Sequence, residues 1–193
     1  MVGYAATATF RAADPPRGSS AYTALEEQLA GFATLPGPAV VVFQDLDDPP
    51  AAATFGEVMC TTYKAFGACG LITSGAGRDL DQVRAIDFPV FTGSTICSHG
   101  YPQITSSMQP VCVGGVTIYP GDLLHGDVNG VTTIPTDIAA HVADLCQPFM
   151  DAEAIVLDYV RRDGATVDGF RKKMAELRDA LGALKKEAQQ RIV

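Results

Sequence analysis

The stretch from Phe55 to Phe91, FGEVMCTTYKAFGACGLITSGAGRDLDQVRAIDFPVF, decides the fold of this chain. The segment Ala51–Phe66 reads as a helix, with Gly56 as the alternative start. The apolar run CGLIT at Cys69–Thr73 predicts a strand buried on both faces. A tight glycine loop at Ser74–Gly77 and a short helix at Asp79–Ile86 are expected to follow. Alternation of strand and helix indicates an α/β fold with parallel strand pairing.

The segments on either side extend this pattern. Upstream, the run AVVVF at Ala39–Phe43 predicts a second buried strand, and the apolar spacing over Ala21–Phe32 predicts an amphipathic helix. The chain opens directly in a small-residue strand at Gly3–Phe10, and this start suggests that an upstream piece of the domain is missing. Downstream, Pro89–Phe91 reads as a third short strand, and Gln109–Ile134 is rich in strand and turn residues.

The last third of the chain is predicted to be helical. Thr136 is suited to cap a helix that Pro148 kinks or breaks, and a final helix is expected over Thr166–Ile192. We therefore expect an α/β core over residues 1–150 and a helical extension over residues 151–193.

Composition narrows the classes of protein that this chain could represent. The chain has 193 residues and a net charge of −8, so an interaction with nucleic acid is not expected. No apolar run is long enough to span a bilayer, and the N-terminus does not resemble a signal peptide. Five cysteines without a CxxC pair disfavour a disulfide scaffold or a zinc site, and indicate free thiols in a reducing cytoplasm.

Two neighbouring segments carry groups suited to an anionic ligand and a cation. The predicted helix start leaves free backbone N–H groups, on Glu57, Val58 and Met59. After the next strand, Arg78 offers a bidentate fork for a carboxylate, and Asp79 offers an oxygen ligand for Mg²⁺. An anion nest, an arginine and a metal-binding aspartate together suit a small 2-oxo acid.

Other interpretations of these residues stay open at this point. Gly75 and Gly77 could simply allow a tight turn, with Arg78 and Asp79 as a solvated pair at a helix start. His99, in the motif SHGY, follows a strand in the same half of the chain. It could assist proton transfer or serve only as a structural loop residue.

Six sequence blocks in the same order resemble the RraA-like family, which includes the 4-hydroxy-4-methyl-2-oxoglutarate aldolases. The blocks are GYAAT at Gly3–Thr7, GEVM at Gly56–Met59, SGAGRD at Ser74–Asp79, FPVF at Phe88–Phe91, GGVTIYPGD at Gly114–Asp122 and GDVNGVTTIP at Gly126–Pro135. The resemblance implies a three-layer β/β/α sandwich of the swivelling phosphohistidine-domain type, with C-terminal helices. It also implies a homo-oligomer, a trimer or hexamer, with sites between subunits.

The same resemblance implies an activity and a role for each site residue. The activity would be that of a class II pyruvate aldolase that cleaves 4-hydroxy-2-oxo acids and also decarboxylates oxaloacetate. Arg78 would bind the substrate carboxylate, and Asp79 would hold Mg²⁺ (or Mn²⁺) with water ligands. Glu153, from a neighbouring subunit, would approach the waters of the metal. The substrate would also be held at the helix start, by Gly56 and the amides of Glu57, Val58 and Met59.

This chain departs from the family pattern at three places. Ser74 stands where the family has an aspartate, and Asn129 replaces a second one in a turn. The family's acidic N-terminal segment is also expected to be missing. A non-catalytic regulator that binds a ribonuclease by protein contact, as in the RraA subfamily, is therefore the alternative, and the acidic surface suits a basic partner. An inactive diverged relative is the third possibility.

Overall fold

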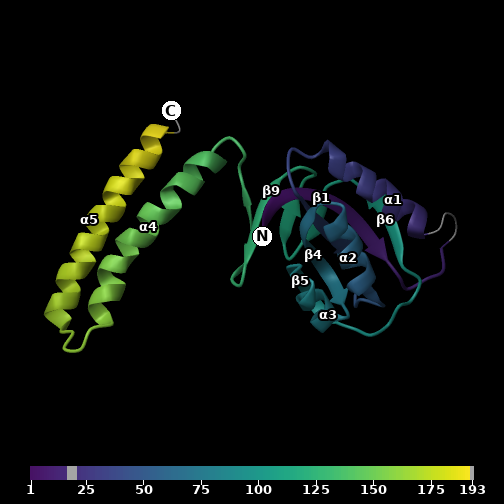
Figure 1. Ribbon diagram of the computed structural model, residues 1–193, viewed down its shortest axis with the longest axis horizontal. Coiled ribbons are helices and arrows are strands. Elements are labelled where there is room, and N and C mark those ends of the chain that lie inside the picture. The colour runs from purple at the N-terminus through teal and green to yellow at the C-terminus, as the bar shows by residue number, and fades with distance from the viewer. Residues whose placement is uncertain (17–20, 192–193) are drawn as a thin grey trace. The chain divides into compact units, whose positions relative to one another are not determined.

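The computed structural model describes residues 1–16 and 21–191, which form two compact units. The first unit is Met1–Ile134 and the second begins at Pro135. The first unit is a mixed α/β fold whose eight-stranded sheet combines parallel and antiparallel neighbours (Figure 1). Its elements are β1 (Val2–Arg11), α1 (Ala21–Gly31), a 3-10 turn η1 (Phe32–Thr34), β2 (Ala39–Asp45), β3 (Ala53–Phe55), α2 (Glu57–Ala65), β4 (Ala68–Gly77), α3 (Leu80–Ala85), β5 (Val90–Thr95), β6 (Gln103–Ser107), β7 (Val111–Val113), β8 (Val116–Ile118), β9 (Leu123–Asp127) and β10 (Gly130–Ile134).

The sheet is parallel at its centre and antiparallel toward one side. The strand order is β10-β9-β1-β2-β4-β3, with β5 also paired to β4 and β6 also paired to β1. Strands β1, β2, β4, β3 and β5 pair in parallel, whereas β6 and β9 run antiparallel to β1. The predicted parallel α/β unit is therefore confirmed. The downstream strands β6, β9 and β10 extend the same sheet, whereas β7 and β8 form a separate hairpin.

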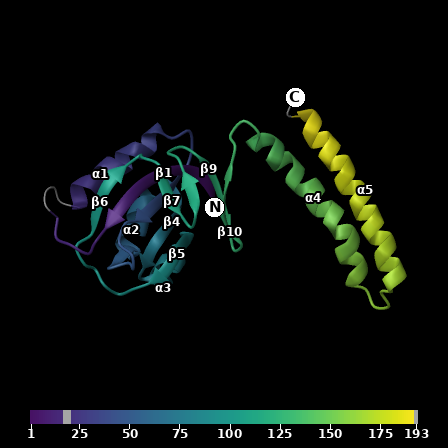
Figure 2. The same ribbon diagram turned by 180° about the vertical axis from the view of Figure 1, so that it is seen from behind.

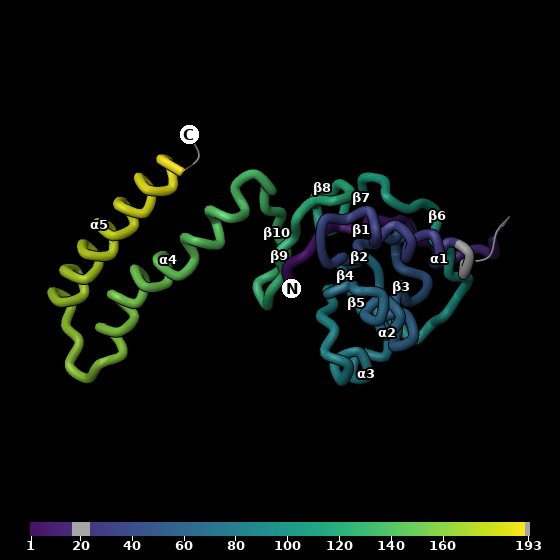
Figure 3. Tube along the Cα trace, turned by 45° about the horizontal axis from the view of Figure 1, so that its top comes forward, coloured from purple at the N-terminus to yellow at the C-terminus, as the bar shows by residue number. Residues whose placement is uncertain are grey.

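Strand β2 is covered on both faces, as its uninterrupted apolar run predicts. Ala39, Val41 and Phe43 lie in a core shared with α1, α2 and α3, whereas Val40 and Val42 lie in a second core shared with the β7–β8 hairpin. Figure 2 shows the sheet from behind, and Figure 3 shows β7 and β8 on one side of β1 and β2 with α2 and α3 on the other. The unit is thus layered as hairpin, sheet and helices.

The core under the helices contains polar groups as well as apolar ones. Tyr63 of α2 is fully buried, and its hydroxyl donates a hydrogen bond of 2.6 Å to Oε1 of the buried Gln28. Burial raises the pKa of Tyr63, so this hydroxyl stays protonated and available as a donor. The bond fixes α2 against α1 beneath the edge where the candidate site lies.

The segment Ser74–Gly77 differs from the predicted tight loop, because it continues strand β4. Ala76 pairs with Ala53 of β3 and with Ser94 of β5, so the sheet holds this segment on both sides. The absence of a side chain on Gly77 leaves room for the ring of Phe55. The glycines therefore serve close packing within the sheet, and the turn begins only at Arg78.

The second unit is a pair of helices, α4 (Ala139–Val160) and α5 (Val167–Arg191). Two predictions for this region are corrected. Helix α4 continues through Pro148, so the break among the two predicted alternatives does not occur, and its N-cap is Ile138, so Thr136 does not cap it. An exposed helix end can dispense with a side-chain cap because water satisfies its N–H groups.

Residue 150, the expected domain boundary, lies within α4, whereas the compact units divide after Ile134. Across α4 and the described part of α5, Ala152 alone is buried, so this unit has almost no core of its own. Among residues 1–16 and 21–191, no helix combines the length and apolar character needed to cross a bilayer.

Candidate functional site

Three segments converge on Gly56, at the start of α2. If Gly56 carried a Cβ, that atom would lie 2.6 Å from Oδ2 of Asp79 and 2.9 Å from Nε of Arg78. The backbone N–H of Arg78 donates to the carbonyl of Phe55 at 3.2 Å, which ties the end of β4 to the end of β3. A glycine is required here because any side chain would displace both charged groups.

Asp79 connects the turn after β4 to the N-terminus of α2. Its Oδ2 accepts a hydrogen bond of 3.1 Å from the N–H of Glu57, and it lies 3.6 Å from Nε of Arg78. Asp79 also adopts a left-handed backbone conformation, with φ 55° and ψ 38°, and its carbonyl accepts the N–H of Val83. A non-glycine residue in this region is uncommon, and such conformations concentrate at functional sites.

The amides at the start of α2 are therefore not equivalent. The Glu57 N–H is used by Asp79 within the chain, whereas the second and third amides of a helix have no acceptor inside it. Those amides belong to Val58 and Met59, and the Val58 side chain is 80% exposed. The predicted anion nest is thus present in part, with one of its three donors occupied by a carboxylate of the chain itself.

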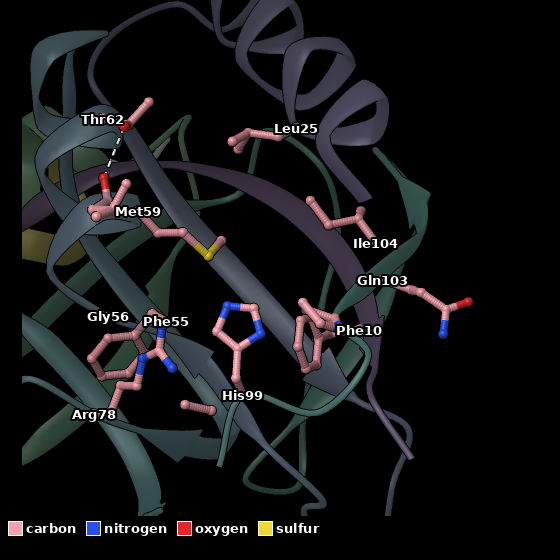
Figure 4. A pocket seen from close by; sticks show the side chains of 13 residues that line it. Phe10, Leu25, Phe55, Gly56, Met59, Thr62, Arg78, His99, Gln103 and Ile104 are labelled. Carbon is pink, nitrogen blue, oxygen red and sulfur yellow. Dashed lines mark hydrogen bonds between the residues drawn. The ribbon is translucent and has the colours of Figure 1, made fainter. Parts of the chain in front are cut away.

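Arg78 lies in the walls of two cavities of different character. One is open and polar, with a volume of about 620 Å³, and includes Asp79, Thr95 and Cys97. The other is smaller, about 210 Å³, and is mostly apolar. Figure 4 shows the side chains that line the smaller cavity, with Arg78 and His99 beside each other and Met59 and Phe10 nearby.

Most polar groups of the smaller cavity are already satisfied. The Thr62 hydroxyl donates to the carbonyl of Val58 at 2.8 Å. The Gln103 amide extends away from the other lining side chains in Figure 4 and donates to the carbonyls of Asp14 and Tyr101. Among the described lining residues, Arg78 and His99 are the side chains left to bind a ligand through charge or polarity, in addition to the free backbone amides of Val58 and Met59.

The residues around Asp79 fit a lightly coordinated hard cation. Within the described part of the chain, no group of three or more His, Cys, Asp or Glu side chains is placed to hold a metal. Mg²⁺ binds through one or two carboxylates and retains several waters, so a single partly exposed carboxylate on an open polar cavity meets its needs. A tetrahedral zinc site with four protein ligands has no match here.

Cys60 lies beneath the site on α2 and is fully buried. Burial, together with the nearby Asp79 carboxylate, raises the pKa of the Cys60 thiol to about 12. The thiol is therefore neutral at physiological pH and is not a nucleophile in this site.

The structure brings together most, but not all, of the predicted site residues. Gly56, Glu57, Arg78 and Asp79 meet at the start of α2. Glu153 is exposed on α4, in the second unit, and its predicted role beside the metal waters stays a prediction.

Sequence reasoning did not find the lining residues Phe10 and Ile104, which face each other in the β1–β6 register. It also did not find Thr95 and Cys97, in the wall of the polar cavity. The available signal was their position at or just after the ends of strands in the half that carries the site.

Comparisons with known proteins identify the family to which the first unit is similar. A family model described as "RraA-like: Aldolase/RraA" matches residues 1–133. Over 107 residues, 55% of this chain, the chain is 36% identical to a protein of Halalkalibacterium halodurans named "Putative 4-hydroxy-4-methyl-2-oxoglutarate aldolase". A protein of Ectopseudomonas mendocina with the same name is 30% identical over 52% of this chain and 63% of its own length. The chain spans about half the length of the first of these relatives.

Among solved structures, this chain is similar to RraAS2 of Streptomyces coelicolor, described as an unusual member of the RNase ES inhibitor RraA protein family. The TM-score is 0.60 and the identity 27%, over 79% of this chain and 74% of that protein.

Proposed function

Because the chain belongs to the RraA-like family, we propose that it is a divalent-metal-dependent lyase that releases pyruvate from a 4-hydroxy-2-oxo acid. The same chemistry would decarboxylate oxaloacetate. The observation that carries the proposal is the meeting of the Arg78 guanidinium, the Asp79 carboxylate and the N-terminus of α2 around Gly56. These groups are the ones that a 2-oxo acid and its cation require.

The roles follow from the chemistry of each group. Breaking the C3–C4 bond leaves its electron pair on the pyruvyl part as an enolate, while the C4 hydroxyl gives its proton to solvent water and becomes a carbonyl. Uptake of a proton from water at C3 then gives pyruvate. Arg78 binds and orients the C1 carboxylate through its fork. The free amides of Val58 and Met59 face developing negative charge, which oriented N–H groups stabilise without reorganisation. Asp79 would hold Mg²⁺ or Mn²⁺, which when bound would supply Lewis-acid polarisation of the 2-oxo group.

Assembly belongs to the same proposal. Family resemblance favours a trimer or hexamer in which Glu153 of one subunit serves the site of another, and a fold of the swivelling phosphohistidine-domain type. The exposed position of Glu153 on α4 leaves its carboxylate free to take such a role. A cytoplasmic location and the absence of nucleic-acid binding stay predictions from composition.

The test measures pyruvate release from oxaloacetate and from 4-hydroxy-4-methyl-2-oxoglutarate, with Mg²⁺ and then with EDTA. We expect turnover that EDTA abolishes and that Mg²⁺ or Mn²⁺ restores. Asp79→Asn is the informative variant, because asparagine tolerates the left-handed conformation that Asp79 adopts but carries no charge. Full metal-dependent activity in a folded Asp79→Asn variant would refute the assignment.

A second candidate rests on the likeness to RraAS2. A regulator of this kind acts by contact with a ribonuclease, and the net charge of −8 suits a basic docking surface. Cleavage of a model RNA by an RNase E-type enzyme, measured with and without this protein, tests it. Inhibition that persists in Arg78→Ala, together with absence of lyase turnover, would favour the regulator.

A further inference from the structure

The two cavities that Arg78 lines differ in a way that bears on the substrate. The polar cavity contains Asp79, whereas the smaller cavity is lined mainly by apolar side chains. These come from five elements or loops and are Phe10, Leu25, Phe55, Val58, Met59 and Ile104. A ligand whose carboxylate pairs with Arg78 would have the small apolar cavity beside it.

Among the described residues that line that cavity, no side chain other than Arg78 offers a second carboxylate a fixed cationic partner. Nε of Arg78 already lies 3.6 Å from Oδ2 of Asp79, and the guanidinium would bind the first carboxylate. The Thr62 hydroxyl and the Gln103 amide already donate hydrogen bonds to backbone carbonyls of the chain. Removing a carboxylate from water without a partner is strongly unfavourable, more so than for an uncharged polar group. A dicarboxylate would therefore lose affinity by placing its far end here.

The cavity has the size of a compact apolar group. Its volume is about 210 Å³, and an apolar cavity of roughly 150 Å³ is enough to hold benzene. Burying such a group is favourable in proportion to the apolar area removed from water. The aromatic and thioether side chains of Phe10, Phe55 and Met59 suit either a phenyl ring or a branched alkyl group.

We propose that the natural substrate is a 4-hydroxy-2-oxo acid whose C4 carries an apolar group, aryl or branched alkyl, that occupies this cavity in place of a second carboxylate. The proposal rests on the proposed function, and it makes the second product an apolar aldehyde or ketone. It departs from the dicarboxylate in the names of the curated relatives.

The first experiment compares kcat/KM for pyruvate release with Mg²⁺ from two matched substrates. One is 4-hydroxy-4-phenyl-2-oxobutanoate and the other is 4-hydroxy-4-methyl-2-oxoglutarate. We expect at least a tenfold preference for the phenyl compound, about the discrimination that a hydrophobic pocket gives. Equal rates, or a preference for the dicarboxylate, would overturn the proposal.

The second experiment measures binding without turnover, so that it separates this proposal from the lyase assignment. Calorimetry with Mg²⁺ compares 2-oxo-4-phenylbutanoate with 2-oxoglutarate, neither of which has a C4 hydroxyl to support cleavage. Tighter binding of the phenyl compound in a protein without lyase activity would keep the cavity assignment and remove the lyase. Turnover of oxaloacetate with no phenyl preference in either experiment would keep the lyase assignment and remove the cavity assignment.

Substitutions in the cavity wall test whether this cavity sets the preference for the phenyl substrate. Ile104→Lys and Met59→Lys each introduce a cation into the apolar wall, and we expect each to reduce the phenyl-over-dicarboxylate ratio at least tenfold. Val128→Lys makes the same kind of change at a fully exposed turn and should leave the ratio unchanged. If both folded cavity variants keep the wild-type ratio, the cavity does not hold the C4 group.

Discussion

The two cavities that share Arg78 are built by different parts of the sequence. The polar one is formed by contiguous motif residues, Gly77 to Leu80, and by Thr95 to Cys97 just after the neighbouring strand. The apolar one draws residues from β1, α1, α2, β6 and the loop that contains His99. The comparison teaches that a short motif identifies the chemistry, whereas the shape of the substrate is set by residues brought together only by folding.

The largest effect is expected at Arg78, where the cavities meet. Arg78→Ala removes the carboxylate fork, and we expect kcat/KM for pyruvate release to fall roughly 10²- to 10³-fold, as for loss of a charged hydrogen-bond donor. Arg78→Lys keeps the charge but loses the planar fork, so its activity should lie between that of the wild type and that of Arg78→Ala. Steady-state kinetics with Mg²⁺ checks both. An Arg78→Lys variant as active as wild type would show that charge alone suffices.

Gly56 lines the apolar cavity and lies directly against Asp79 and Arg78. A Cβ at this position would lie within 2.9 Å of both Asp79 and Arg78, so Gly56→Ala should lower activity at least tenfold. We also expect a loss of about 1–3 kcal/mol in the free energy of unfolding, typical of overpacking.

The matched control for Gly56→Ala is Gly182→Ala in α5, where nothing lies within 4 Å of the new methyl group. This change should stabilise the protein by roughly 0.5–1 kcal/mol because alanine favours the helix. Denaturant unfolding measures the change in the free energy of unfolding of both variants, and steady-state kinetics measures their activity. Equal behaviour of the two would contradict the crowding at Gly56.

A smaller effect is expected on the alkylation rate of a cysteine in the wall of the polar cavity, because a bound ligand should shield its thiol. Cys97 lies in the wall of the polar cavity, whereas Cys112 is exposed on β7 and outside both. We expect pyruvate with Mg²⁺ to slow alkylation of Cys97 about threefold or more at saturation, following occupancy of the site. Mass spectrometry of both peptides measures this. Equal slowing at Cys112 would mean that the ligand acts on the reagent and not on the site.

The smallest effect is expected at a carboxylate that lines neither cavity. Burial raises the pKa of Asp45, at the end of β2, above 3.8, and the charge of Asp47 adds to this while the Asp47 N–H opposes it. One of its oxygens, Oδ2, is buried without a partner among the described groups. Because the folded-state pKa is raised, ionised Asp45 destabilises the fold, and stability is gained as pH falls through the raised value toward 3.8.

Asp45→Asn should therefore stabilise the protein at pH 7 by about 1 kcal/mol, or roughly 2–4 °C in Tm. The gain should shrink as pH approaches 4. Thermal unfolding at pH 7, 5.5 and 4 tests this, with Asp81→Asn on exposed α3 as the control that should change little. A pH-independent gain would assign the effect to packing instead of charge.

The elements that sequence predicts best are those whose pattern is local. The run AVVVF predicted a strand buried on both faces, and its residues indeed alternate between two cores. The helix beginning at Gly56 and the Arg78-Asp79 turn were also placed correctly. In each case the pattern of neighbouring residues carries the signal.

The elements that sequence mispredicts depend on partners distant in the chain. Ser74–Gly77 looks like a loop because glycines are common in turns, yet pairing with β3 and β5 extends it as strand. Pro148 looks like a helix break, although the helix continues through it. The apolar cavity depends on the pairing of Phe10 with Ile104, and no local pattern reveals that register.

The buried thiol of Cys60 gives the site a reporter that does not depend on catalysis. With a pKa of about 12 and no exposed surface, it is neither ionised nor accessible in the folded protein. A thiol reagent can therefore modify Cys60 only during transient opening of α2, the helix whose first turn forms the anion nest. A ligand that binds the closed state slows this opening by the factor 1 + [L]/Kd. The labelling rate of one native cysteine thus measures occupancy of the site, even for compounds that the protein binds but does not cleave.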